Sequence, residues 1–371
     1  MEDDADMDRR SAVRTMLGAG ALPLVGACAR AAGTRSRLTP RQRAGQRVVF
    51  SYPGLTVPAA LLRQISAGQA AGVIFFGENV SGEAQIAAVI RQLRQAQRRS
   101  PVASPLLLMT DQEGGLVRRL PGAPVLSQKQ AGAAADPVAA ARSAGAGAGR
   151  NLAGAGMNVN LAPVLDVYHA PGDFTDQYQR SYSSSAATAA ACGRAFITAQ
   201  QHAGVAATAK HFPGLGRAAA WQNTDTGPVT LRVPLPALRA RDEVPYPAAI
   251  AAGVKLVMAS WAVYPALDAR YPAGLSSAVI QGELRGRLGF RGVTITDAVE
   301  AGALASFGSY GQRAVLAAQA GMDLLLCSAR DVSQGQAVVT ALAGALDGGK
   351  LGTAGFDAAV RRVTALRGSL R

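Results

Sequence analysis

The chain has 371 residues, of which 49% are hydrophobic, and a formal net charge of +14. This length and apolar content allow one large core and exclude an intrinsically disordered chain. The basic charge comes without basic–aromatic interleaving or a recognition-helix motif, which argues against a nucleic-acid partner.

The three cysteines, Cys28, Cys192 and Cys327, cannot form a closed disulfide framework, and no Cys/His spacing fits a metal site. Cys192 and Cys327 lie in apolar runs and are predicted to be reduced core thiols.

The N-terminal segment has the pattern of an export signal. Arg9 and Arg10 precede an apolar run from Met16 to Ala27, which is too short to cross a bilayer as a helix and fits a twin-arginine signal. The run ends in "LVGAC", which resembles a bacterial lipobox and predicts lipidation of Cys28. An ordinary secretory signal cleaved nearby is the alternative. We therefore predict an export signal at 1–27, a linker at 28–40 and one domain at 41–371, exported and anchored on the outer face of the cell membrane.

Six arginines lie between Arg30 and Arg47, next to the predicted anchor. Positive charge in this position favours an anionic lipid or an anionic wall polymer as a neighbour. We expect the protein to be monomeric.

From about residue 41 the chain alternates short apolar runs with Ala-rich segments of helical character. Each run is almost continuously apolar, as a strand buried on both faces must be. The segment 81–99 places Ile86, Val89, Ile90 and Leu93 on one helical face, and Ser81 is predicted to cap that helix. Eight such strand–helix units predict a single-domain α/β fold, a (β/α)8 TIM-like barrel; an open doubly wound sheet is the alternative. The runs are 47–52, 71–76, 105–110, 157–162, 205–210, 255–260, 292–297 and 322–327.

Polar side chains follow several of these runs directly. Asp111, the Lys210–His211 pair and Asp297 all fall where a barrel collects its functional residues, at the C-terminal ends of strands. Any one of them could be a helix cap or a strand-end ion pair. The chain has only four lysines and three histidines, so an adjacent Lys–His pair at this place is unusual. Several donors beside a carboxylate suit a polyhydroxylated ligand.

The motifs of the chain resemble those of bacterial glycoside hydrolase family 3, most nearly the single-domain β-N-acetylglucosaminidases that trim peptidoglycan fragments. The similar segments, in order, are "GVIFFGENV", "DQEGGLVRRL", "NLAPVLDV", "RSY", "KHFPGLG", "VMAS", "YPALD" and "TDAVEAGAL". The resemblance covers roughly residues 40–370. It implies a barrel, a retaining mechanism, a terminal β-linked sugar as substrate, most closely N-acetylglucosamine from cell-wall glycans, and neither a metal nor an organic cofactor.

The resemblance also implies roles for individual residues. Asp297 would be the nucleophile that forms a glycosyl-enzyme. Cations nearby would keep its carboxylate ionised; a helix cap is the structural alternative for this residue. The residues that would bind the sugar or line its pocket are Asp111, Arg119, Arg180, Lys210 and His211.

The sequence departs from the family on the loop after "KHFPGLG". Relatives carry an Asp-Ser-His dyad there, in which the histidine is the acid/base, whereas this chain has Asn223, Thr224 and Asp225 and no histidine after His211. Leu215 also replaces a histidine. In one interpretation Asp225 is the acid/base, with its pKa raised by burial or a nearby carboxylate, and Asn223 hydrogen-bonds to it.

In the other interpretation, "QNTDTGP" is a surface turn and the protein binds glycans but cleaves them weakly or not at all. Trp221 could stack on a sugar in either case. An ionised aspartate would repel an incoming phosphate, so if Asp225 is the base, water is the expected acceptor.

Overall fold

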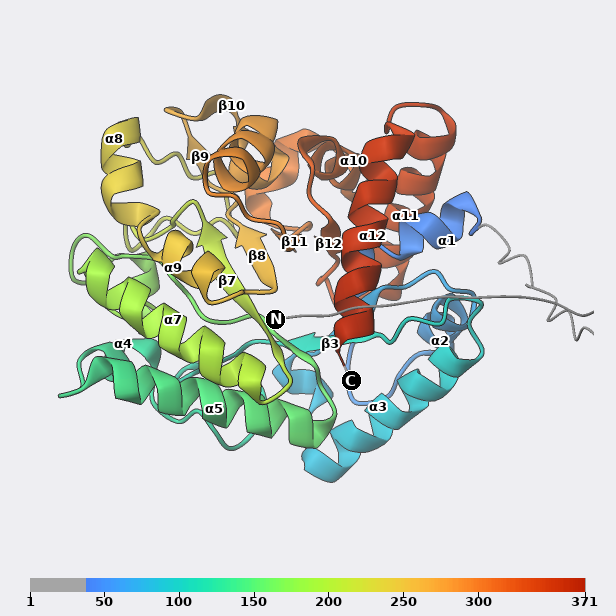
Figure 1. Ribbon diagram of the computed structural model, residues 1–371. Helices are drawn as coiled ribbons and strands as arrows, with labels where there is room; N and C mark the ends of the chain where they lie inside the picture. Colours follow the sequence, from blue (N-terminus) through green and yellow to red (C-terminus); the bar gives the residue numbers. More distant parts are fainter. Residues whose placement is uncertain (1–37, 371) are drawn as a thin grey trace, which may run out of the picture. The chain divides into compact units, whose positions relative to one another are not determined.

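The computed structural model describes residues 38–370, and in this part of the chain eight parallel strands close into a barrel (Figure 1). Each strand coincides with one of the eight predicted apolar runs, although β7 and β11 extend slightly beyond theirs. The strands are β1 (Val48–Phe50), β2 (Gly72–Ile74), β3 (Leu107–Thr110), β6 (Val159–Asn160), β7 (Ala206–Phe212), β8 (Leu256–Ala259), β11 (Val293–Ala298) and β12 (Leu324–Leu326).

The order of strands around the barrel follows their order along the chain. The ring closes because β1 pairs in parallel with β2 on one side and with β12 on the other, where Val48 is opposite Leu325. The (β/α)8 prediction is therefore confirmed. The doubly wound alternative is wrong, because an open sheet would leave β1 and β12 unpaired with one another.

A helix follows each barrel strand and packs on the outside of the barrel (Figure 1). These helices are α2 (Ala59–Ser66), α3 (Glu83–Arg98), α5 (Pro137–Ala155), α7 (Ala186–His202), α9 (Pro245–Ala251), η4 (Ala278–Arg287, wound as a π-helix), α10 (Tyr310–Ala320) and α11 (Val332–Asp347). Two more helices flank the series, α1 (Pro40–Gly45) before β1 and α12 (Thr353–Ser369) after α11.

Shorter elements lie within the loops. They are η1 (Gly77–Asn79), β4 (Gln112–Gly114), β5 (Val117–Arg118), α4 (Gln128–Gly132), α6 (Phe174–Gln177), α8 (Leu235–Ala237), η2 (Leu238–Asp242), β9 (Val263–Tyr264), β10 (Asp268–Pro272), η3 (Ala273–Leu275) and η5 (Gly302–Phe307). The hairpin of β4 and β5 matters for the site. Gly114 and Gly115 both have positive φ, and a side chain on either would collide with Leu126 or Ser127.

Helix α3 illustrates how the local sequence sets the packing. Its predicted apolar face is buried, with Ile86 and Leu93 fully excluded from solvent. The predicted cap is wrong, because the N-cap residue is Gly82 and no side chain caps the helix. The backbone N–H of Ser81 instead donates to the side chain of Gln85 at 3.1 Å.

Helix α12 closes the N-terminal end of the barrel. Leu366 and Leu370 pack against side chains from the barrel interior. The Arg367 guanidinium donates to the carbonyls of Ser104 and Pro105, just before β3, at 2.8 and 2.6 Å. With this end filled, the C-terminal ends of the strands are the end at which a ligand can enter.

The predicted export signal at 1–27, Cys28 and most of the predicted linker at 28–40 lie outside the described residues. The described residues begin at Leu38, inside that predicted linker, and helix α1 starts at Pro40, the last residue of the linker. No helix within residues 38–370 combines the length and the apolar character needed to cross a membrane. Cys192 and Cys327 are buried free thiols, as predicted.

Candidate active site

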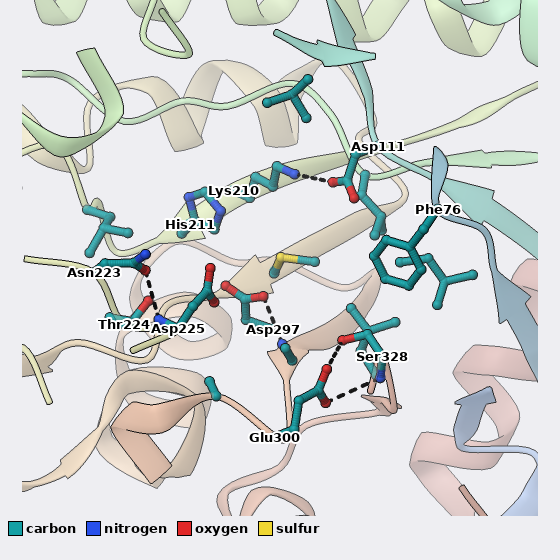
Figure 2. A pocket seen from close by; sticks show the side chains of 18 of the residues that line it. Phe76, Asp111, Lys210, His211, Asn223, Thr224, Asp225, Asp297, Glu300 and Ser328 are labelled. Atoms are coloured by element: carbon teal, nitrogen blue, oxygen red, sulfur yellow. Dashed lines mark hydrogen bonds and ion pairs between the residues drawn. The ribbon is translucent and has the colours of Figure 1, made fainter. Parts of the chain in front are cut away.

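A cavity of about 500 Å³ opens at the C-terminal ends of the barrel strands. Its walls come from several strands: Lys210 and His211 lie in β7, Asp297 in β11, and Asp111 directly after β3. Figure 2 shows these side chains converging on one space. All predicted site residues in the described part of the chain line this cavity, namely Asp111, Arg119, Arg180, Lys210, His211, Asp225 and Asp297.

Lys210 is the centre of an ion-pair network on one wall of the cavity. Its Nζ lies 2.7 Å from Oδ1 of Asp111 and 2.8 Å from Oε1 of Glu113. Burial alone would lower the pKa of Lys210, but the two carboxylates reverse this and raise it. Lys210 is therefore a charged, buried donor in a fixed position.

Glu113 was not predicted from the sequence. Arg180 holds its carboxylate in a two-point contact, with Nε and Nη2 each 2.9 Å from a carboxylate oxygen. Burial opposes ionisation of Glu113, yet Arg180 and Lys210 together lower its pKa to about 2. Glu113 thus positions both Lys210 and Arg180.

His211 is oriented by a second buried carboxylate that the sequence analysis missed, Asp166. The Nδ1 of His211 lies 2.7 Å from Oδ2 of Asp166, and the backbone N–H groups of His211 and Leu215 donate to Oδ1. Burial opposes ionisation of Asp166, but His211 and these N–H donors lower its pKa overall. With Nδ1 engaged, Nε2 is the ring nitrogen left for the cavity.

Asp297 is the second-last residue of β11, and its side chain faces the cavity (Figure 2). Its Oδ1 accepts the backbone N–H of Ala298 at 2.8 Å. No helix begins at this point, since the next element, η5, starts at Gly302. The helix-cap alternative for Asp297 is therefore wrong.

Asp225 projects toward Asp297 from the loop between β7 and α8 (Figure 2). Desolvation by the cavity wall, followed by the negative charges of Asp297 and Glu300, raises the pKa of Asp225 to about 6, while His211 and Arg180 oppose the shift. Because Asp225 as a whole residue is exposed, solvent screens part of this shift. The cavity thus holds a pair of carboxyl groups, one of which retains its proton to a higher pH.

The loop that carries Asp225 is both a turn and a wall of the cavity. The Asn223 side chain accepts the backbone N–H of Asp225 at 2.8 Å and so orders the turn. The predicted hydrogen bond between Asn223 and Asp225 is therefore made to the backbone of Asp225. The backbone carbonyls of Thr224 and Asp225 accept N–H groups from Ala303 and Gly302 at the start of η5. Trp221 does not line the cavity and is 81% exposed, so nothing supports the predicted stacking.

Glu300 is a fourth carboxyl group that lines the cavity, and the sequence analysis did not single it out. One of its oxygens accepts a hydrogen bond from the Ser328 hydroxyl at 2.6 Å (Figure 2). The other accepts one from the Gln334 amide at 2.8 Å. These donors fix the orientation of the Glu300 carboxylate.

Two further arginines line the cavity. Within the described residues the buried Nε of Arg119 has no hydrogen-bond partner, so it is available to a ligand. Arg330 stacks over the ring of Phe76, 4.6 Å from the ring centre. Among residues 38–370 no group of His, Cys, Asp and Glu side chains is arranged to hold a metal ion.

The sequence matches the model of the glycosyl hydrolase family 3 N-terminal domain over residues 50–366. An uncharacterized secreted glycosyl hydrolase of Arthroderma benhamiae is 47% identical over 88% of this chain and 93% of its own length. A beta-hexosaminidase of Xylella fastidiosa is 34% identical over 85% of this chain and 95% of its own length.

Solved structures agree with these matches. A family 3 β-N-acetylglucosaminidase from a Paenibacillus species has a TM-score of 0.84 and 35% identity over 90% of this chain, which spans 62% of the length of that protein. A β-N-acetylhexosaminidase from Beutenbergia cavernae has a TM-score of 0.80 and 35% identity over 89% of this chain and 99% of its own. The chain therefore belongs to glycosyl hydrolase family 3, and it is a glycosidase.

Proposed function

We propose that the protein is a retaining β-N-acetylglucosaminidase that removes a terminal sugar from cell-wall glycans, with Asp297 as nucleophile and Asp225 as acid/base. One observation carries this proposal: the carboxyl groups of Asp225 and Asp297 face each other in a cavity whose other polar side chains suit a sugar. Retaining glycosidases need two such carboxyl groups close together.

In the first step the Asp297 carboxylate attacks the anomeric carbon of the sugar, while protonated Asp225 gives its proton to the departing glycosidic oxygen. This forms an ester between Asp297 and the sugar and leaves Asp225 ionised. In the second step Asp225 takes a proton from water, the resulting hydroxide attacks the anomeric carbon, and the ester bond breaks. The sugar leaves with its β configuration, and both carboxyl groups return to their starting states.

The remaining cavity residues have binding roles in this proposal. Asp111, Lys210 and the Nε2 of His211 hold sugar hydroxyls, and Arg119 supplies an unpaired donor. Because Glu113 and Asp166 already fix these donors, little reorganisation is needed when the sugar binds.

The relatives support the choice of sugar and the site of action. Several are named beta-hexosaminidase or β-N-acetylglucosaminidase, and the Arthroderma relative is described as secreted. Together with the twin arginine and the "LVGAC" segment, this supports export of the chain and lipidation at Cys28.

A chromogenic β-N-acetylglucosaminide tests the proposal. Wild type should release the chromophore, and Asp297→Ala and Asp225→Ala should each reduce kcat strongly. β-Glucoside and β-xyloside analogues should be poorer substrates. A wild-type protein that binds N-acetylglucosamine without cleaving the chromogenic substrate would instead establish a glycan-binding protein on this scaffold.

The acceptor provides a second test. Since an ionised Asp225 repels an anion, added phosphate should not accelerate turnover, and no glycosyl phosphate should form. Formation of glycosyl phosphate would contradict the assignment of Asp225 as the base.

A further inference from the structure

Helix α3 carries a row of arginines at its C-terminal end. Arg91, Arg94 and Arg98 follow one another at spacings of three and four residues, so they lie on one side of the helix, and Arg99 extends the row. All four are exposed. None of them forms an ion pair with another residue of the described chain. The acid of this helix, Glu83, lies in its first turn, at the opposite end.

Part of this charge has a local explanation, because cations near a helix C-terminus interact favourably with the helix dipole. Arg94 also donates to the carbonyl of Gly156 at 2.8 Å. These contacts do not account for the whole row, since like charges three and four residues apart weaken a helix. Arg63, exposed in the last turn of α2, adds a fifth cation on the helix that packs against α3. We call these five residues, Arg63, Arg91, Arg94, Arg98 and Arg99, the basic face.

The basic face borders a recess that has no negative charge of its own. A cavity of about 440 Å³ lies between the C-terminal end of α3 and the chain segments that enter β3 and β6. Arg94 and Arg98 line it together with Gln97, Ser100 and Asn158, and no carboxylate does. Such a lining suits an anionic group.

The basic face and the start of the described chain lie on the same end of the barrel. In α1, the Gln42 side chain donates to the carbonyl of Ala67, which follows α2, at 3.2 Å. At the end of α2, the Ser66 hydroxyl donates to the carbonyl of Ala96 in α3 at 3.2 Å. Figure 1 shows α1, α2 and α3 as neighbours. All of these contacts are at the N-terminal ends of the strands, away from the catalytic cavity.

From these observations we infer that the basic face binds the anionic phospholipid surface to which the protein is anchored, so that the catalytic cavity faces away from the membrane. The inference rests on the proposed export and anchoring. Nine residues, 29–37, separate the predicted anchor at Cys28 from Leu38, and a chain of that length spans at most about 35 Å. The tether therefore keeps this end of the barrel near the bilayer, where arginines attract anionic headgroups. A wall polymer would have to compete with that membrane for the same face.

The test uses the full-length chain carrying Cys28→Ser, so that no acyl chain contributes to binding. Sedimentation with phosphatidylcholine vesicles, with and without phosphatidylglycerol, should show binding only when phosphatidylglycerol is present, and high salt should release the protein. Replacing Arg63, Arg91, Arg98 and Arg99 by Gln should weaken the partition coefficient at least about tenfold. Arg94 is left intact because it bonds to Gly156.

The matched control replaces Arg142, Arg194, Arg232 and Arg270 by Gln, which removes the same charge from exposed positions on other elements. It should bind anionic vesicles like the wild type. Equal loss in both variants would overturn the inference, since net charge alone would then explain binding. Equal binding to neutral vesicles, or retention on a phosphate-rich wall polymer without vesicle binding, would also overturn it.

Hydrolysis of the soluble chromogenic substrate and the Tm are measured for each variant. Both should be unchanged, because the basic face is remote from the cavity. A protein that binds anionic vesicles through the basic face but does not cleave the substrate would refute the proposed function and leave this inference standing.

Discussion

Asp225 differs in charge from a histidine acid/base, because an aspartic acid is uncharged when protonated and negative after it has given up its proton. In this chain the partner carboxylates Asp297 and Glu300 keep a proton on Asp225 to a higher pH than an ordinary aspartate would. A carboxylic acid in such surroundings can protonate a leaving group near neutral pH, as general acids in other glycosidases do. In the proposed mechanism Asp225 therefore supplies the proton for the leaving group.

Replacing Asp225 by Ala should reduce kcat/KM for a disaccharide substrate by about 10²- to 10⁴-fold, the contribution expected of a general acid. The loss should be smaller for a nitrophenyl glycoside, because nitrophenolate leaves without needing a proton. Steady-state kinetics on both substrates measure the difference. Equal losses on the two substrates would show that Asp225 has a structural role instead.

The pH profile depends on the same residue. Asp225 must be protonated to act as the general acid in the first step. We therefore expect kcat/KM to fall as the pH rises through about 6, the pKa of Asp225. Glu300 contributes to the raised pKa, so Glu300→Gln should move this limb to lower pH, because one negative charge near Asp225 is lost. Asp347→Asn, at the exposed end of α11, is the control and should leave the profile in place. An unmoved limb in Glu300→Gln would refute this coupling.

The loop after β7 and the helix η5 work together to place Asp225. The backbone of the loop accepts two N–H groups from the first residues of η5, and Gly302 at that contact has no room for a side chain. A Cβ at residue 302 would lie 2.5 Å from the backbone of Thr226 and 3.0 Å from the carbonyl oxygen of Asp225. The position of Asp225 therefore depends on the close approach of the loop after β7 to η5.

Gly302→Ala should push this loop outward and misplace Asp225. Displacements of about 1 Å at a reacting group can cost about 10²-fold in rate, so we expect kcat to fall between ten- and a hundredfold. KM should change little, since the sugar is held on the opposite wall. Gly355→Ala in α12, where a Cβ meets nothing, is the matched control. A Gly302→Ala enzyme with wild-type kcat would show that the loop tolerates the shift.

The barrel strands could be predicted because their sequence signal is local. A strand covered on both faces is almost continuously apolar, and the eight runs showed this pattern with only a few polar residues among them. The cap of α3 could not be predicted, because Ser81 and Gly82 compete for the N-cap position and the backbone path decides between them.

The site was predictable only in part for a related reason. The seven predicted residues stand at strand ends or in motifs, whereas Glu113 and Asp166 act through contacts with residues far away in the sequence. Both lie inside the quoted motifs "DQEGG" and "NLAPVLDV", and that position was the available signal. Trp221 was misplaced because stacking depends on the direction of an exposed side chain, which the sequence does not encode.

The two ends of the barrel differ in role. The catalytic cavity lies at the C-terminal ends of the strands, and a buried ion-pair network that stabilises the fold lies at the N-terminal end. At the N-terminal end, the buried carboxylate of Asp323 accepts hydrogen bonds from Arg285 at 2.6 Å and Arg362 at 2.7 Å, and from the backbone of Thr294 at 2.9 Å. These contacts tie η4, α12 and two neighbouring strands together. None of these residues lines the catalytic cavity.

Asp323→Ala should therefore destabilise the fold without changing the chemistry. Removing one partner of a buried ion pair leaves Arg285 uncompensated and costs about 3–5 kcal/mol. Denaturant unfolding should show this loss, while kcat of the folded fraction should match the wild type. Asp347→Asn again serves as the control and should leave the free energy of unfolding unchanged. A large fall in kcat with Asp323→Ala would mean that the two ends of the barrel are coupled.

The most direct measurement is identification of the covalent intermediate. A 5-fluoro analogue of N-acetylglucosamine with a good leaving group should form the glycosyl-enzyme faster than water removes it. Mass spectrometry of the digested protein should then find one labelled peptide, with the sugar on Asp297, and NMR of ordinary turnover should show β-N-acetylglucosamine as the first product. A label on another residue, or an α-configured first product, would contradict the assignment of Asp297 as the nucleophile.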